Sequence, residues 1–224
     1  MAAGRRRDDR VETVNTIKHA AALYKAHLVG KTFLYVFDNR YIEVIFKAEN
    51  FKHLAGVDSP LSAKRFYSLA VNRQLESNQI SFSSRHPFAL CRKKLAHISE
   101  LAHLAESESF MLEEIVTNSR TYKFGTTDLN FTLCMGEDLY PDGEKKSGCY
   151  VVQSLRDEDC FDKARNVYSV THILSKSNDT KLYSNIIYVD HASAQLNLPT
   201  SVTPMMTQDI LKKLNVAAND TRVR

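Results

Sequence analysis

The chain contains 224 residues, of which 43% are hydrophobic and 25% are charged. These proportions are typical of a folded globular protein, and they exclude a chain that is disordered along its whole length. The formal net charge is +4 and the isoelectric point is about 8.8. This mildly basic balance permits a phosphate-rich partner, although a protein that coats nucleic acid would be more basic.

The cysteines do not have the spacing of a metal site. Cys91, Cys134, Cys149 and Cys160 form no Cys-x-x-Cys pair, and no histidine pair stands at a matching spacing. No run approaches 18 apolar residues and no secretory leader is recognisable. We therefore expect a cytoplasmic protein with reduced thiols, no membrane partner, no metal and no cofactor.

The chain begins with a basic stretch. Residues 1–10 are expected to form a flexible basic N-terminus, which is either a solvated end or an electrostatic arm for RNA. A helix is predicted from Val11 to Leu28, because apolar residues recur there at spacings of three and four. Gly30 follows as the stop.

A β-hairpin is predicted next. The segments Lys31–Phe37 and Tyr41–Phe46 are rich in Phe, Tyr, Val and Ile, which favours strands. Between them stand Asp38, Asn39 and Arg40, a turn of residues that tolerate tight backbone angles.

Three helical segments should follow the hairpin. The first covers Glu49–Leu54 and ends at Gly56, and the second starts with Ser59 as N-cap and Pro60. The third begins at Pro87 and has an apolar stripe made of Phe88, Cys91, Leu95, Ile98, Ala102 and Ala105. His97 should lie on the solvated face opposite that stripe, so we do not nominate it for function.

From Glu113 the apolar period changes to two. Strands are predicted at Glu113–Phe124, Leu129–Met135, Cys149–Leu155, Val167–Ser175 and Asn185–Val189. A turn is predicted at Pro141, Asp142 and Gly143, and a charged connection over Arg156–Ala164.

The pattern predicts an α+β fold with N-terminal helices packed on a central antiparallel sheet. Residues 11–190 would form this domain, and 191–224 a C-terminal extension with a short helix at Thr207–Leu214 and a frayed tail.

Familiar catalytic signatures are missing from the sequence. It has no Gly-rich phosphate loop, no Gly-x-Ser-x-Gly elbow and no His-Glu-x-x-His helix. The acids Asp157, Glu158 and Asp159 are either a solvated edge or a magnesium site. What remains is a set of cationic and hydroxyl residues. Such a set suits a metal-free ribonuclease, in which the ribose 2′-OH attacks the phosphate.

Three segments could hold such a site. Ser81–Pro87, with Arg85 and His86, either binds an anion before a helix or only caps that helix. Arg120–Thr132, with Lys123 and Thr132 on one face, is either a sheet-borne active site or a solvent face. The third candidate combines Ser154–Arg156 with Val170–Ser177. There His172 is either a satisfied core residue or a base.

Four segments carry a family resemblance. They are Gly30–Phe46 with its continuation Asn50–Val57, then Ile80–Phe88, Tyr122–Leu133 and Ser154–Asp159. Together, over residues 28–190, they resemble the phage-associated barnase/EndoU/colicin/RelE-like nuclease family, fourth group.

The resemblance implies an α+β fold with a central antiparallel sheet of about four strands, and metal-independent RNA cleavage. It fixes no catalytic triad, so the candidates are the polar residues of the three segments. The catalytic candidates are His172, Lys123, Arg156, Thr132 and Ser175. The RNA-binding candidates are Arg85 and His86, together with Lys93 in the helix that follows them. In this hypothesis His172 transfers a proton while Lys123 and Arg156 stabilise the phosphorane, which requires these three residues to converge on one face.

The leading hypothesis is therefore an endoribonuclease of a phage or mobile element that cuts tRNA, mRNA or a guide RNA. A second hypothesis is an anti-CRISPR-type inhibitor of host defence, which binds a Cas effector or its guide RNA without cutting. A third is a structural or packaging-associated virion protein.

Overall fold

The computed structural model of the chain describes residues 2–100, 109–118, 120–190 and 198–220. In this part of the chain the α-helices are α1 (Ala2–His27), α2 (Phe51–Ala55), α3 (Ala63–Val71), α4 (Phe88–Glu100) and α5 (Gln208–Asp220). The strands are β1 (Lys31–Phe37), β2 (Arg40–Ile45), β3 (Phe110–Val116), β4 (Thr121–Thr127), β5 (Thr132–Leu139), β6 (Lys145–Arg156), β7 (Ala164–Ser177) and β8 (Asn185–Val189). Short 3-10 turns are found at Ala48–Asn50, Ser77–Gln79, Phe161–Lys163 and Thr203–Met205.

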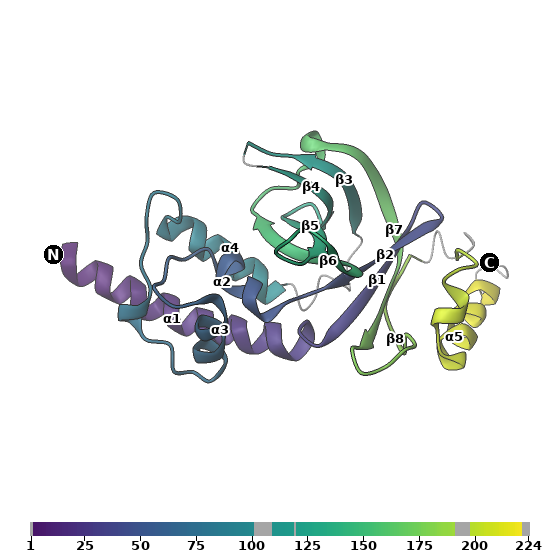
Figure 1. The fold of residues 1–224 in the computed structure, drawn as a ribbon, viewed down its shortest axis with the longest axis horizontal. Helices are drawn as coiled ribbons and strands as arrows, with labels where there is room; N and C mark the ends of the chain where they lie inside the picture. Colours follow the sequence, from purple (N-terminus) through teal and green to yellow (C-terminus); the bar gives the residue numbers. More distant parts are fainter. Residues whose placement is uncertain (1, 101–108, 119, 191–197, 221–224) are drawn as a thin grey trace.

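The strands form one sheet in the order β1-β2-β6-β5-β4-β3-β7-β8. An additional β1–β7 pairing links seven of them into a ring, to which β8 adds through β7 (Figure 1). The α+β class is confirmed, but the expectation of an antiparallel sheet of about four strands is wrong. The sheet is larger and mixed, because β2 and β6 pair in parallel at Val44–Tyr150 and Ile45–Val151.

The first hairpin is confirmed. Asp38 and Asn39 have φ values of 48° and 55°, the left-handed pair that a two-residue hairpin turn requires. Its strands β1 and β2 pair from Thr32–Ile45 to Phe37–Arg40.

Other boundaries differ from the prediction. The expected strand Glu113–Phe124 is two strands, β3 and β4, joined by a turn in which Thr117 Oγ1 donates to the Arg120 carbonyl at 2.7 Å. That turn contains neither glycine nor proline, and Asn118 and Ser119 are the only residues of a turn-forming type in its sequence. Helix α3 is capped by Ser62, whose side chain accepts from the Arg65 amide, and not by Ser59. Helix α1 begins at Ala2, so residues that were expected to precede it form its first turns.

Helices α1 to α4 gather at one end of the sheet (Figure 1). They pack mainly on one another, and α2 also contacts β6. Tyr24 of α1 is fully buried, with its ring centroid 5.2 Å from that of Phe51 and 6.0 Å from that of Phe46. The same core continues into the strands through Phe33, Phe124 and Val152. The helices thus pack at one end of the ring of strands, near β2 and β6, instead of covering one broad face.

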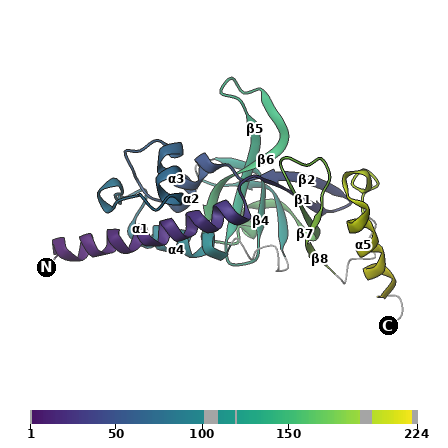
Figure 2. The same cartoon turned by 90° about the horizontal axis from the view of Figure 1, so that it is seen from below.

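Helix α5 lies at the opposite end of the molecule from α1 (Figure 2). Ile210 and Leu214 of this helix are buried together with Leu34 of β1 and Leu174 of β7. The predicted last helix is therefore confirmed and extended to Asp220, and it packs on the sheet.

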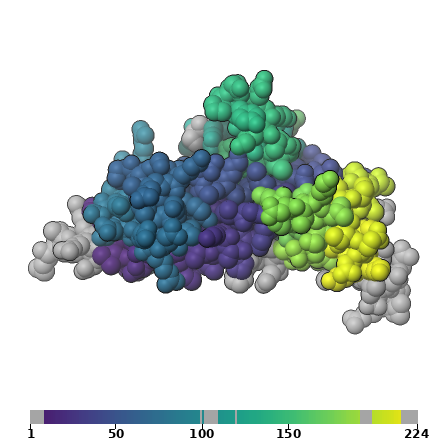
Figure 3. Space-filling view, turned by 60° about the horizontal axis from the view of Figure 1, so that its bottom comes forward, coloured from purple at the N-terminus to yellow at the C-terminus, as the bar shows by residue number. Residues whose placement is uncertain are grey.

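The β5–β6 hairpin stands out from the body of the molecule (Figures 2 and 3). Its turn contains the predicted Pro141-Asp142-Gly143 sequence, with Gly143 at φ 90° and its amide bonded to the Tyr140 carbonyl. No helix in the described residues is both long and apolar enough to cross a membrane.

Candidate functional site

A cleft of about 980 Å³ separates the helices from the sheet. Its helical wall comes from α2, α4 and the segment before α4, and its other wall from β4, β5 and β6. The basic side chains that line it are Lys47, His53, Arg85, His86, Lys94, Arg120 and Arg156. The acidic ones are Glu49, Glu137, Asp138, Asp157 and Glu158.

Lys94 is the least accessible cation of the cleft. Its relative exposure is 8%, and it forms no ion pair or hydrogen bond with any described residue. Burial lowers the pKa of its ammonium group, and the nearby Arg156 lowers it further. A buried lysine with no anion beside it is costly, so the site favours a bound anion.

Gly56 leaves room for the Lys94 stem. This glycine ends α2 in a left-handed conformation with φ 67°. A Cβ atom added there would lie 2.8 Å from Lys94 Cδ, closer than two carbon atoms can pack. The glycine therefore serves both the helix end and the placement of the lysine.

Arg156 ends β6 beside Lys94. Its Nη1 donates to Glu158 Oε1 at 3.1 Å, while its Nε is buried and has no hydrogen-bond partner among the described residues. Its guanidinium carbon lies 5.9 Å from the centre of the Tyr122 ring, and Arg120 lies over the same ring at 4.4 Å. Both arginines thus flank Tyr122 on the sheet side of the cleft.

Two histidines face the same cleft from the helical side. Desolvation by the surrounding cleft residues lowers the pKa of His53 to about 4, and Lys94, Arg120 and His86 add to this effect, although the side chain stays exposed in the open cleft. His53 is therefore neutral near pH 7 and able to accept a proton. His86 is held by Asp58, whose Oδ1 lies 2.6 Å from His86 Nδ1.

Most of the acids in the cleft are already paired. Asp138 binds Lys47 and accepts from Ser147, Glu137 pairs with Lys145, and Asp157 binds both Lys93 and His97. Glu158 likewise pairs with Arg156 and Lys163.

Three lysine and arginine side chains of the cleft, in contrast, have no ion pair within the described residues. They are Lys94, Arg85 and Arg120. The five lysines and arginines of the lining equal its five acids in number, but these three cations are left available to bind a phosphate.

The structure brings together only some of the predicted site residues. Arg156, Arg85 and His86 line the cleft, whereas His172, Lys123, Thr132 and Ser175 do not. The expectation that His172, Lys123 and Arg156 converge on one face is therefore wrong.

His172 and Ser175 lie within the sheet. They are 3% and 2% exposed on β7, between β1 and β8. Burial lowers the pKa of His172 to about 4, and its Nδ1 lies 3.0 Å from Thr171 Oγ1. Its surroundings match the alternative of a satisfied core histidine.

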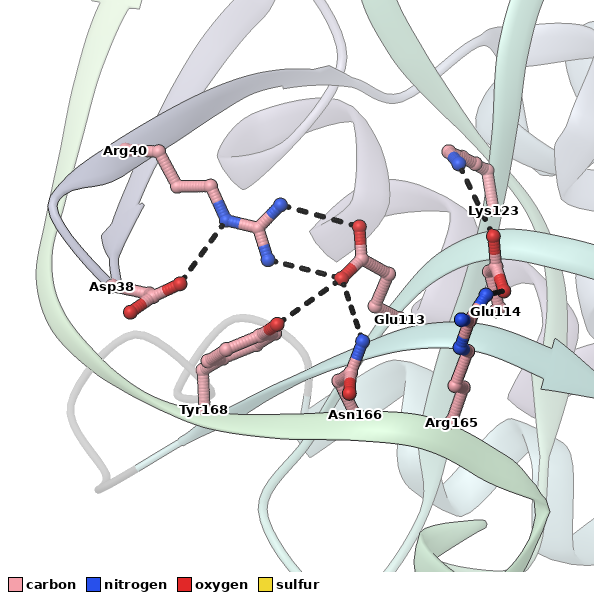
Figure 4. Close-up of polar contacts among 8 residues, drawn as sticks. All are labelled: Asp38, Arg40, Glu113, Glu114, Lys123, Arg165, Asn166 and Tyr168. Atoms are coloured by element: carbon pink, nitrogen blue, oxygen red, sulfur yellow. Dashed lines mark hydrogen bonds and ion pairs between the residues drawn. The ribbon is translucent and has the colours of Figure 1, made fainter.

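Lys123 faces away from the cleft because its neighbour Tyr122 faces into it, and adjacent strand residues point to opposite sides. Its ammonium group lies 3.6 Å from Glu114, which Arg165 also binds (Figure 4). Thr132 is buried, and its hydroxyl donates to the Glu158 carbonyl at 2.7 Å, so it holds the segment after β6.

The lysine of α4 that lines the cleft is Lys94, and not the nominated Lys93. Lys93 points outward and binds Asp157 at the rim, while Lys94 enters the cleft. His97 was expected on a solvated face, which is wrong. Its side chain is 14% exposed, binds Asp157 at 2.8 Å and stacks on the Phe131 ring at 4.6 Å. His53 and Arg120 are the other cleft residues that we did not single out from the sequence.

A second polar cluster joins β2, β3 and β7 (Figure 4). Arg40 forms two hydrogen bonds to Glu113, at 3.2 and 3.0 Å, and its guanidinium lies over the Phe37 and Tyr168 rings. Asn166 and Tyr168 also donate to Glu113. Since Glu113 is saturated with donors, we interpret this cluster as a structural tie across the ring.

Among the described residues, no group of three or more His, Cys, Asp or Glu side chains is placed to hold a metal ion. The cysteines of the described part are all unpaired thiols.

The chain matches a known protein family over the residues that form the cleft. The profile of the family described as phage-Barnase-EndoU-ColicinE5/D-RelE like nuclease4 matches residues 16–192. The chain belongs to this family. The match includes every basic residue of the cleft and ends before α5. The family resemblance predicted from the sequence is thereby confirmed, and it implies a nucleic-acid substrate. No curated protein and no solved structure matches the chain.

Proposed function

We propose that this protein is a metal-independent endoribonuclease and that the cleft between the helices and β6 is its active site. The observation that carries the proposal is Lys94, a buried lysine in the cleft with no anion beside it among the described residues. A nuclease needs positive charge where the scissile phosphate gains negative charge. Lys94 and Arg156 provide this charge, and the cleft that they line lies within the part of the chain that matches the nuclease family.

The reaction that fits these groups is internal transesterification. The ribose 2′-oxygen forms a bond to phosphorus while the bond from phosphorus to the 5′-oxygen breaks. The 2′-OH proton passes to a base, and the departing 5′-oxygen takes a proton from an acid. The products are a 2′,3′-cyclic phosphate and a 5′-hydroxyl.

The two histidines suit the two proton transfers. His53 has a lowered pKa and is neutral at pH 7, so it serves as the base. His86 is oriented by Asp58, whose Oδ1 lies 2.6 Å from its Nδ1, and it serves as the acid for the departing 5′-oxygen. Lys94 and Arg156 stabilise the pentavalent phosphorane. Arg85 and Arg120 hold the flanking phosphates of the RNA chain.

The test uses the purified protein, single-stranded RNA oligonucleotides and excess chelator. We expect cleavage with chelator present, with products that end in 2′,3′-cyclic phosphate and 5′-hydroxyl when analysed by mass spectrometry. One 2′-deoxy substitution at the cut site should abolish that cut and leave binding intact, because it removes the nucleophile.

Cleavage that needs a divalent metal, or that proceeds equally at the 2′-deoxy position, would contradict the proposal. RNA that is bound and remains intact, in the presence and absence of added metal, would instead favour the inhibitor hypothesis.

A further inference from the structure

The register of β6 changes in the wall of the cleft. Cys134 of β5 pairs with Ser154, whereas the next residue, Met135, pairs with Val152. Gln153 is therefore left without a partner across the ladder, as the extra residue of a β-bulge. Such a bulge redirects side chains, and as a result both Gln153 and Ser154 line the cleft.

Gly136 on the neighbouring strand provides the space for the Gln153 amide. A Cβ atom at Gly136 would lie 2.5 Å from Gln153 Nε2 and 2.7 Å from Oε1. A side chain at this position would push the amide, the far end of a flexible side chain, to another place. The amide therefore lies against Gly136 of β5.

The Gln153 amide has its hydrogen-bonding groups available. It makes no hydrogen bond with any described residue, although it borders the cleft. Neighbouring polar groups are occupied: the Asn50 amide donates to the Val152 carbonyl, and Asp138 binds Lys47 and Ser147. Gln153 thus offers one donor and one acceptor side by side to a ligand in the cleft.

Gln153 and Arg156 lie on the same strand, three residues apart. At roughly 3.3 Å per residue, their Cα atoms are separated by roughly 10 Å. Arg156 and Lys94 form the phosphate end of the cleft, so Gln153 lies along the strand from that end, where a nucleotide would place its base. An amide with adjacent donor and acceptor complements the Hoogsteen edge of adenine, where the N6 amino donor lies beside the N7 acceptor, a pair that the same edge of the other three bases lacks.

We propose that Gln153 is a specificity-determining residue that reads the base of the nucleotide held at Lys94 and Arg156, and that it selects adenine in unpaired RNA. This inference rests on the proposed function of the cleft. The bulge at Gln153 brings the side chain to the cleft, and the glycine at 136 leaves room for its amide.

The test measures binding separately from cutting. Five-residue oligonucleotides with 2′-O-methyl ribose throughout cannot be cleaved, and they carry uracil at every position except the central one. The central base is adenine, guanine, cytosine or uracil, and affinity is followed by fluorescence anisotropy. We expect the wild-type protein to bind the adenine oligonucleotide about tenfold more tightly than the others, as one paired amide contact allows.

Three variants sharpen the test. Gln153→Ala should make the four affinities equal, and Gly136→Ala should do the same by displacing the amide. Gln153→Glu should shift the preference toward cytosine, because a carboxylate accepts from the cytosine amino group. Gln74→Ala, at an exposed position outside the cleft, serves as the matched control and should keep the adenine preference.

Equal affinity of the wild-type protein for all four oligonucleotides, or an adenine preference that survives Gln153→Ala, would overturn the inference. Cleavage of unmodified RNA without base preference would remove this inference and leave the nuclease proposal standing. Adenine-selective binding without any cleavage would support this inference and contradict the nuclease proposal. A Gly136→Ala variant that does not fold leaves Gln153→Ala and Gln153→Glu to decide.

Discussion

At the scale of single residues, the chemistry depends on which face of an element a side chain occupies. Lys93 and Lys94 are adjacent on α4, yet one binds Asp157 at the surface and the other is 8% exposed in the cleft. The helical period contained the signal. Lys94 follows Cys91 by three residues and precedes Ile98 by four, so it lies on the apolar stripe. A lysine on such a stripe indicates a buried cation.

Other site residues left no such signal in the sequence. His53 belongs to a helix of five residues, too short for a period to show which face is buried. Arg120 ends a turn that sequence patterns did not reveal. His172 stood out in an alternating pattern, but that pattern placed it in the core.

Two histidines with similarly lowered pKa values provide a direct comparison. The pKa values of His53 and His172 are both about 4, but only His53 borders the cleft. We expect His53→Gln to lower kcat by about 10² to 10⁴, the usual range for loss of a general base. His172→Gln should leave kcat unchanged at a temperature where both variants are folded. Steady-state RNA cleavage measures kcat for both variants. A larger loss of kcat in His172→Gln than in His53→Gln would indicate that His172 on β7 is the base.

His172 should instead make folding sensitive to acid. Its pKa is about 4 in the folded protein and 6.5 in the unfolded chain, so below pH 6.5 the unfolded state binds more protons. The free energy of unfolding should therefore fall as the pH decreases from 6.5 to 4. A difference of this size corresponds to about 3 kcal/mol.

Urea unfolding between pH 4 and 8 measures this effect. His172→Gln should make the dependence on pH shallower, with the contribution of His53 remaining, whichever way it changes stability at pH 8. A pH dependence equally steep in the variant would show that other groups cause it.

At the scale of elements, the sequence predicted single strands and helices better than their ends. Strand β8 matches the prediction residue for residue, and the β1–β2 hairpin was evident from its turn. The β3–β4 connection was missed because Thr117 and Arg120 close it through side-chain and backbone bonds, without glycine or proline. The bulge at Gln153 was also invisible, since a register change depends on the partner strand.

Helix α5 lies beyond the family match but covers part of the sheet. Ile210 is 1% exposed, whereas Lys212 on the same helix is exposed. We expect Ile210→Ala to lower the free energy of unfolding by about 2 to 5 kcal/mol, through lost burial and the cavity that remains. Lys212→Ala should change it by less than about 0.5 kcal/mol.

Denaturant titration of the two variants tests this packing. Cleavage activity should be retained by both under folding conditions, because α5 does not line the cleft. A negligible effect of Ile210→Ala would show that α5 does not contribute to the fold in solution.

At the scale of the whole molecule, the α+β class followed from the order of elements, whereas the ring of strands did not. The ring depends on β1 meeting β7 and on β2 meeting β6, contacts between segments more than a hundred residues apart. Local patterns contain no information about such pairings. The cleft arises from the same long-range contacts, since it joins α2 and α4 to β6. The sequence alone therefore did not show which charged residues meet in the cleft.

The most direct test of the cleft as the site of RNA cleavage compares Lys94→Met with Lys93→Met. We predict that Lys94→Met lowers kcat/KM for RNA by about 10² or more, as loss of a group that stabilises transition-state charge does. Its stability should be equal or higher, because a buried unpaired charge is removed. Lys93→Met should cleave like the wild type. If Lys94→Met retains wild-type activity, or if both variants lose activity equally, the cleft is not the site that we describe.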